Sequence, residues 1–120
     1  MNEREAYIAL NMMEKIGPVG VRSLAEQLGS VPAIFEAGRD ALMSARGIGS
    51  EAAAAIIRQR ETVDWQGEIE RAGRMNARII TQIDPEYPKQ LLEIHDPPLA
   101  LYIRGSIESR DKHAIAVVGT

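Results

Sequence analysis

Two glycine-containing breaks constrain the fold of the N-terminal half more than any other feature of this sequence. The first is Gly17-Pro18-Val19-Gly20, and the second, Gly47-Ile48-Gly49, begins 30 residues later. Each break separates two short segments in which apolar residues recur at helical spacing. The regular interval favours a repeated unit, a pair of helices joined by a tight turn, over two unrelated corners of a small bundle. We therefore expect an all-α tandem helix-hairpin-helix (SAM-like) domain over residues 1–60.

The helices of this region follow from apolar spacing and from residues that start or stop helices. We predict helices over residues 3–14, 21–28, 39–45, 51–60 and 62–75, with a turn-rich segment at 30–38. Gly29 suits a C-terminal cap, and Ser50 can cap the helix that follows it. The last helix carries an apolar stripe formed by Trp65, Ile69, Ala72 and Met75. We interpret residues 61–76 as a connecting helix, with Trp65 in the core.

The two glycine turns could bind phosphate. Tight turns expose backbone N–H groups at a helix N-terminus, where the positive end of the helix dipole attracts an anion. The candidate phosphate contacts of the two hairpins are Gly17, Gly20, Arg22, Gly47, Gly49 and Ser50. Ile48 is expected to bury its side chain and fix the second hairpin. Glu51 follows Ser50, however, and would repel phosphate, so contact with a protein partner and a purely structural role both stay open.

The character of the chain changes after Asn76. We predict strands over residues 78–81, 99–103 and 114–118, with one or two helical turns at 89–94 between proline-punctuated loops. The last strand is a continuous apolar run, as in a strand buried on both faces of a parallel sheet, and it leads into Gly119 and Thr120.

A buried strand that leads into glycine is how a βα phosphate-binding unit begins. We therefore predict that residues 77–120 start a Rossmann-like α/β domain that is incomplete here, which makes the fold α+β overall. On this interpretation the chain is the N-terminal part of a longer protein. A helix or a self-contained antiparallel hairpin at 114–118 would argue against it.

Composition excludes several kinds of site. The chain has 120 residues and no cysteine, so a disulfide, a thiolate zinc site and a cysteine nucleophile are excluded. With only two histidines, no metal or other cofactor is predicted. No apolar run approaches the ~20 residues that span a bilayer, so we expect no membrane contact and a soluble, cytoplasmic protein. The net charge of −3 means that any contact with DNA must be local.

Polar and aromatic residues outside the glycine turns are interpreted as structural. Tyr87 and Tyr102 are expected to bury their rings and to hydrogen-bond through their hydroxyls. Arg104 is expected at the surface. No Ser/His/Asp set or pair of carboxylates stands at a recognisable catalytic spacing, so no catalytic residue is predicted.

A series of short motifs in the C-terminal part points to one family. In order they are Tyr87-Pro88, Leu91-Leu92, Asp96-Pro97-Pro98, Leu101-Tyr102, Arg104-Gly105 and Val118-Gly119-Thr120. Over residues 79–120 the chain closely resembles the DNA-processing protein A family, also called DprA or Smf. Residues 1–60 look like the family's variable N-terminal domain, a weaker match.

The resemblance implies a non-enzymatic protein that binds single-stranded DNA, protects incoming DNA during natural transformation and loads the RecA recombinase, working as a homodimer. It also implies that Gly119 and Thr120 belong to a loop that binds DNA phosphates. Because this chain holds only the start of that pocket, we expect it alone to bind single-stranded DNA weakly or not at all. Two other functions stay open: a protein-interaction adaptor, and a nucleotide-processing enzyme on a Rossmann-like fold.

Overall fold

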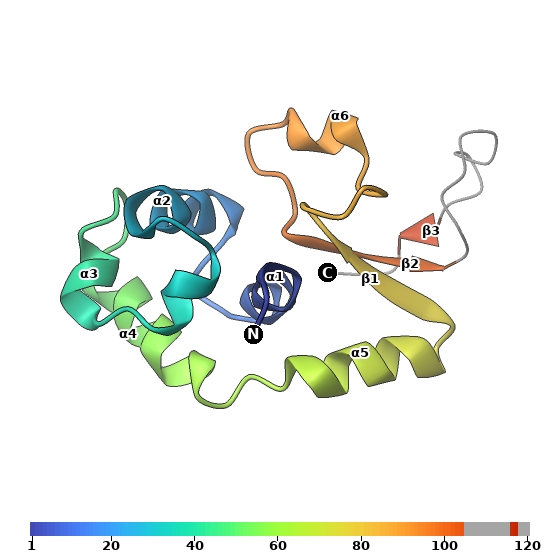
Figure 1. Cartoon of the computed structure of the whole chain (residues 1–120), viewed down its shortest axis with the longest axis horizontal. Coiled ribbons are helices and arrows are strands. Elements are labelled where there is room, and N and C mark those ends of the chain that lie inside the picture. The colour runs from blue at the N-terminus through green and yellow to red at the C-terminus, as the bar shows by residue number, and fades with distance from the viewer. Residues whose placement is uncertain (105–115, 118–120) are drawn as a thin grey trace.

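The computed structural model describes residues 1–104 and residues 116–117 (Figure 1). Part of the strand predicted over residues 114–118 and the candidate phosphate residues Gly119 and Thr120 lie outside these described residues. Five α-helices and a 3-10 turn precede the first strand: α1 (Glu3–Asn11), α2 (Pro18–Leu28), η1 (Pro32–Phe35), α3 (Arg39–Met43), α4 (Ser50–Arg60) and α5 (Trp65–Arg74). The remaining elements are β1 (Ala77–Thr81), α6 (Lys89–Leu92), β2 (Ala100–Arg104) and β3 (Ala116–Val117).

Local signals explain where several of these helices begin and end. At the start of α1, the N–H of Glu5 donates to Asn2 Oδ1 at 2.8 Å and the N–H of Asn2 donates to Glu5 Oε1 at 2.9 Å, which forms a capping box. Asp64 caps α5 by accepting from the N–H of Gly67 at 3.0 Å. The predicted C-terminal cap at Gly29 is confirmed by its left-handed φ of 98°.

Several predicted helix boundaries are wrong, among them the start of the helix predicted over residues 62–75, which begins at Trp65, and the end of the one predicted over 39–45, which is at Met43. The helix predicted from residue 21 begins at Pro18, because proline fits the first helical position, where no N–H is needed. Ser50 does not cap α4: it lies inside the helix, and Gly49 is the N-cap without a side-chain hydrogen bond. The first helix ends at Asn11 rather than at residue 14, and Lys15 beyond it takes a positive φ of 71°.

The described strands form an antiparallel sheet in the order β1-β2-β3. Ile79 pairs with Tyr102 in the register of β1 and β2, and Val117 pairs with Ile103 in the register of β2 and β3. The parallel arrangement predicted for the last strand is therefore wrong for this pairing. An apolar run indicates burial but not direction, and the eleven residues at 105–115 are fewer than the dozen or so that a parallel crossover needs.

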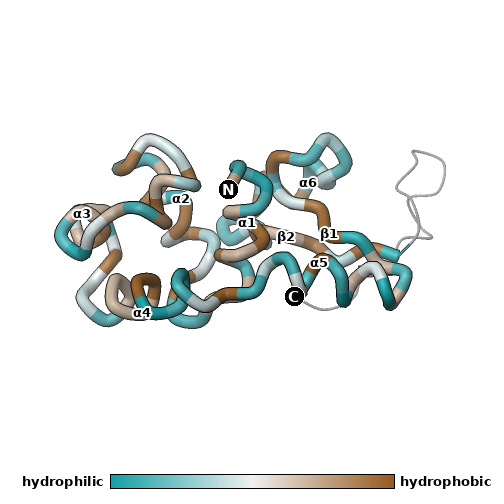
Figure 2. Tube along the Cα trace, turned by 60° about the horizontal axis from the view of Figure 1, so that its bottom comes forward, coloured by the Kyte–Doolittle hydropathy of each residue, from teal (hydrophilic) through white to brown (hydrophobic). Residues whose placement is uncertain are grey.

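The first helix lies between the hairpins and the sheet and contributes to the core of both (Figure 1). Its Leu10 packs with the hairpins, whereas Ile8 packs with Ile79 of β1. Successive β1 residues face opposite sides of the sheet, so Ile79 joins the α1 and α5 side and Ile80 joins Tyr87 on the other. In Figure 2 apolar residues mark β1 and β2, whereas α5 carries mostly hydrophilic ones.

The largest core cluster holds the two hairpins together. Its buried members are Ala6, Leu10, Met13, Val21, Leu24, Val31, Ile34, Leu42, Ala45, Ile48, Ala53, Ile56 and Leu99. Leu99, just before β2, brings the strand region into contact with this cluster. None of the helices described here is both long enough and apolar enough to pass through a membrane.

Candidate functional site

The N-cap glycines of α2 and α4 share an extended backbone, but they are Gly17 and Gly49, 32 residues apart. The 30-residue interval between Gly17 and Gly47 is therefore not the structural repeat: Gly47, with φ 81°, corresponds to Lys15, with φ 71°. Gly17 precedes α2 with φ −121° and ψ −177°, and Gly49 precedes α4 with φ −91° and ψ −176°. Neither helix has a side-chain hydrogen bond at its N-cap, so no capping side chain occupies the N–H groups of the first turn. Both turns therefore present backbone donors, although Pro18 removes one of them from α2.

The two hairpins meet at Gly20. A Cβ on this residue would lie 2.5 Å from Ile16 Cδ1 and 3.4 Å from Ile48 Cδ1. Gly20 therefore lets the first hairpin approach Ile48 in the turn of the second. Ile48 is buried, as predicted, and the preceding Gly47 adopts a φ of 81° that a residue with a side chain would rarely take.

Polar side chains on α4 hold the first hairpin and η1 in place. Gln59 Oε1 accepts from the N–H of Glu14 at 2.8 Å, and Gln59 Nε2 donates to the carbonyl oxygen of Glu14 at 2.8 Å. Arg60 Nη1 donates to the carbonyl oxygens of Ile34 at 2.9 Å and Ala37 at 2.8 Å. Nothing in the sequence singles out these residues, because a contact between distant segments leaves no local pattern.

Charge around the second turn does not favour phosphate. Glu51, in the first turn of α4, has a side chain that is 81% exposed, and its Oε1 lies 3.3 Å from Lys15 Nζ. An ion pair between exposed side chains contributes little free energy, so the lysine only partly offsets the negative charge. The second turn therefore places a carboxylate beside the donors of Gly49 and Ser50.

Charge around the first turn is different. Arg22 lies on α2 and is exposed, and it lines cavities of about 560 and 320 Å³ on this side of the hairpins. Arg46 lines the larger cavity, together with Gly47. Of the six residues predicted to contact phosphate, the structure thus brings Arg22 and Gly47 to one cavity. Gly49 lies in a separate depression with Lys15.

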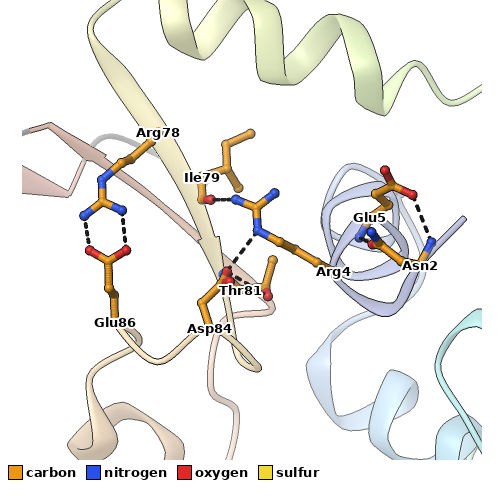
Figure 3. A network of polar contacts seen from close by, with 8 residues as sticks. All are labelled: Asn2, Arg4, Glu5, Arg78, Ile79, Thr81, Asp84 and Glu86. Atoms are coloured by element: carbon orange, nitrogen blue, oxygen red, sulfur yellow. Dashed lines mark hydrogen bonds and ion pairs between the residues drawn. The ribbon is translucent and has the colours of Figure 1, made fainter.

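A polar network joins α1 to the edge of the sheet (Figure 3). Arg4 Nη2 donates to the carbonyl oxygen of Ile79, and Arg4 Nε lies 3.3 Å from Asp84 Oδ2. The same carboxylate oxygen accepts from the N–H of Thr81 at 2.6 Å and from Thr81 Oγ1 at 3.1 Å. Asp84 thereby fixes the end of β1.

The family-like motifs at Tyr87 and Tyr102 have structural roles, as predicted. Tyr87 is buried and its hydroxyl donates to the carbonyl oxygen of Pro98 at 2.7 Å. Tyr102 is half-buried and its hydroxyl donates to Glu68. This hydrogen bond, and then two more from Arg71, hold the pKa of the Glu68 carboxyl below its usual value.

The exposure of side chains at Arg104 and along α5 agrees only in part with the predictions from the sequence. Arg104 is exposed, as predicted, whereas Trp65, predicted in the core, is only half-buried against the Ile8 and Ile79 cluster. The apolar stripe of α5 is only partly buried, because Ile69 is 36% and Met75 56% exposed. No cluster of three or more acidic or histidine side chains able to hold a metal ion occurs within the described part of the chain.

The comparisons with known proteins follow the two parts of this structure. Residues 7–62, which form the helical region, match the family model described as a SAM-like helix-hairpin-helix tandem, and this match gives the class of that domain. Residues 78–120 match the model described as DNA recombination-mediator protein A. Together the matches confirm the α+β fold with an N-terminal helical tandem and the resemblance to the N-terminal portion of the DNA-processing protein A family. The second match extends over β3, which pairs antiparallel with β2 and not in parallel as a Rossmann-like start predicts.

One relative aligns along nearly the whole chain. Protein Smf of Synechocystis sp. is 30% identical over 124 residues, which cover 99% of this chain and 31% of the relative. The chain thus spans about a third of the length of that protein. No solved structure matches the chain significantly.

Proposed function

We propose that this chain is the N-terminal part of a protein that binds single-stranded DNA, protects incoming strands during natural transformation and loads the RecA recombinase onto them. The observation that carries this proposal is the match of residues 78–120 to the recombination-mediator model. It is supported by the alignment of nearly the whole chain with protein Smf. The role is one of binding and transfer, without catalysis, and the working unit is a homodimer.

The mechanism is directed at the DNA backbone. Amides and basic side chains hold phosphates, while the bases stay largely unread, so binding does not depend on sequence. In this proposal residues 77–120 begin a Rossmann-like domain, and Gly119 and Thr120 form part of its phosphate loop. Residues 1–60 form the hairpin domain, and residues 61–76 connect the two.

The two hairpins make unequal contributions in this proposal. The first offers Gly17, Gly20 and the exposed Arg22 to phosphate, and no carboxylate stands in its first helical turn. At the second, the exposed Glu51 beside Gly49 and Ser50 opposes an anion. That carboxylate favours a protein partner as the ligand of the second hairpin, which keeps the adaptor function as a second candidate for the helical part alone.

RecA loading provides the test. The protein made from the complete gene should shorten the lag before RecA hydrolyses ATP on single-stranded DNA coated with a single-strand-binding protein. Gly119→Ala in that protein should lengthen the lag, because the added methyl group obstructs the approach of a phosphate. Gly38→Ala is the matched control, since a Cβ at Gly38 meets nothing within 4 Å. An unchanged lag with the unmodified protein would contradict RecA loading.

A further inference from the structure

Two cavities border α2, one beside the turn before α4 and one beside the loop that follows β1, and together they are called the groove here. It consists of two adjoining cavities of about 560 and 320 Å³, which share Arg22 and Glu26 as lining residues. Arg46 lines the larger cavity, and Tyr7 and Gln82 line the smaller one. The groove therefore joins the helical hairpins to the region that resembles the recombination-mediator family.

The charge of the groove differs from that of the chain. Arg22 and Arg46 are exposed, and within the described residues neither takes part in an ion pair. Ser23 Oγ donates to the carbonyl oxygen of Arg46 at 2.6 Å, which fixes the backbone of that residue beside α2. Glu26 supplies one opposing charge. Two guanidinium groups against one carboxylate among its lining residues make the larger cavity locally positive in a chain of net charge −3, whereas Glu3 also acts near the smaller one.

The smaller cavity contributes an aromatic ring, that of Tyr7, beside these charged groups. Tyr7 is half-buried there and lines the cavity together with Arg22. Burial and then the charge of Glu3 raise the pKa of Tyr7, and Arg22 opposes this rise. Gln82 Nε2 donates to the carbonyl oxygens of Pro97 at 2.8 Å and Pro98 at 3.1 Å, which fixes its amide at the opposite wall. An aromatic ring and a fixed amide near an arginine suit a base that is linked to its phosphate.

On the basis of the proposed function, we propose that this groove is a second binding site for single-stranded nucleic acid, with phosphates on Arg22 and Arg46 and a base against Tyr7. The site extends the DNA path from the strand region onto the helical hairpins. An acidic peptide shares the negative charge of such a strand but has no flat base for the Tyr7 wall, so the ring favours nucleic acid. Because Glu26, and Glu3 near Tyr7, oppose the two cations, its affinity is low.

A nuclear magnetic resonance titration suits a site of low affinity. The probe is a twelve-nucleotide thymidine strand, added to the 120-residue chain at low salt. Amide signals of Arg22, Ser23 and Gly47 should shift together with that of Gln82, whereas those of Arg71 and Arg74 on α5 should stay in place. The dissociation constant from these shifts should rise with salt concentration.

Charge variants test the arginines and the carboxylate. Arg22→Gln should weaken binding about three- to tenfold and reduce the slope of log affinity against log salt by about 0.7 for each phosphate that the protein no longer neutralises. Glu26→Gln should strengthen binding by a few-fold, because it removes the opposing charge. Arg58→Gln is the matched control: Arg58 is exposed on α4 and lines neither cavity. It should lower affinity less than Arg22→Gln does.

Tyrosine variants test the stacking wall. Tyr7→Phe keeps the ring and should keep the affinity, whereas Tyr7→Leu should weaken binding about tenfold. Because Tyr7 also packs against the hairpin core, Tyr7→Leu is informative only if its spectrum remains that of the folded chain. The charge variants, which lie on the surface, do not depend on that condition.

Three results would overturn the proposal. The first is no shift in the groove, whether the strand binds elsewhere or not at all. The second is equal loss of affinity in Arg22→Gln and Arg58→Gln. The third is equal binding of an oligo-glutamate peptide of the same charge, which would make the groove a site for acidic protein segments. None of these results bears on RecA loading by the complete protein, so the proposed function stands or falls separately.

Discussion

Arg4 of α1 donates a hydrogen bond from Nη2 to the carbonyl oxygen of Ile79, on a strand whose second edge carries no partner strand among the described residues. Asp84 completes the arrangement by pairing with Arg4 and accepting from the N–H of Thr81 (Figure 3). Two side chains thus satisfy backbone groups of β1 that another strand would otherwise pair. The network also ties α1, a helix of the hairpin region, to the sheet.

Replacing Arg4 tests this link. Arg4→Gln should lower the free energy of unfolding by about 1–2 kcal/mol, because it removes a charged donor from a backbone carbonyl and from Asp84. The arginine side chain is 39% exposed and that of Asp84 20%, which keeps the expected loss below that of a fully buried pair. Urea denaturation gives the measurement, and Arg74→Gln on the exposed side of α5 is the control. Equal stability of the Arg4 and Arg74 variants would contradict the link.

Gly20 should tolerate a small side chain but not a large one. In Gly20→Ala the new methyl group meets Ile16 Cδ1, the flexible end of a side chain that can move, while the helix gains about 1 kcal/mol of propensity. The net change should stay within about 1 kcal/mol. Gly20→Val should destabilise by about 1–3 kcal/mol, because its branches also press on Ile48 in the second hairpin. Thermal unfolding distinguishes the two, and equal melting temperatures would show that the hairpins do not meet tightly here.

Replacing each of two glycines of α5 by alanine should change the stability of the protein in opposite directions. Gly73→Ala adds a methyl group that meets nothing within 4 Å, so it should stabilise the protein by about 0.5–1 kcal/mol. Gly67→Ala places a Cβ 2.7 Å from Asp64 Cγ and displaces the carboxylate that caps the helix. It should therefore bring no gain or a loss. Chemical denaturation of both variants in parallel is the measurement, and a similar gain at Gly67 would contradict the capping role of Asp64.

The pH dependence of stability should report on Glu68. The hydrogen bond from Tyr102, and then those from Arg71, lower the pKa of this carboxyl in the folded state from an ordinary value of 4.5. A lowered folded-state pKa stabilises the fold above the unfolded value, and the contribution is lost as the pH falls through the lowered pKa. Carbon-13 titration should show that Tyr102→Phe raises the pKa of Glu68 toward its ordinary value more than Arg71→Gln does. The reverse order would contradict the assignment of the main cause to Tyr102.

The sequence predicted the order of elements because apolar spacing and glycine breaks are local signals. It missed the Arg4 to Asp84 network and the contacts of Gln59, since polar pairing between segments far apart in the chain leaves no periodic trace. The start of α2 at Pro18 could have been recognised from the preference of proline for the first helical position. The antiparallel direction of β3 could also have been predicted, because the connection between residues 104 and 116 is shorter than a parallel crossover needs.

Of the candidate site, only the glycine turns before the helices could be predicted from the sequence. The equivalence of Gly17 and Gly49 was missed, because they lie 32 residues apart and not at the 30-residue interval. The sequence also could not show that Arg22 lines the same cavity as Arg46 and Gly47. That convergence depends on how the hairpins pack at Gly20. Ile69 is more exposed than its place in the apolar stripe of α5 indicates, because a helix that contacts its neighbours along one narrow side leaves part of that stripe exposed.

The central claim is that the chain belongs to a machinery for single-stranded DNA, and equilibrium binding tests it most directly. Fluorescence anisotropy should compare a labelled thirty-nucleotide single strand with the duplex of the same sequence, using the protein from the complete gene. We predict that the single strand binds at least about tenfold more tightly and that its affinity falls with salt, while the 120-residue chain alone binds far more weakly. Equal affinity for the duplex, or no binding of the single strand, would contradict the account.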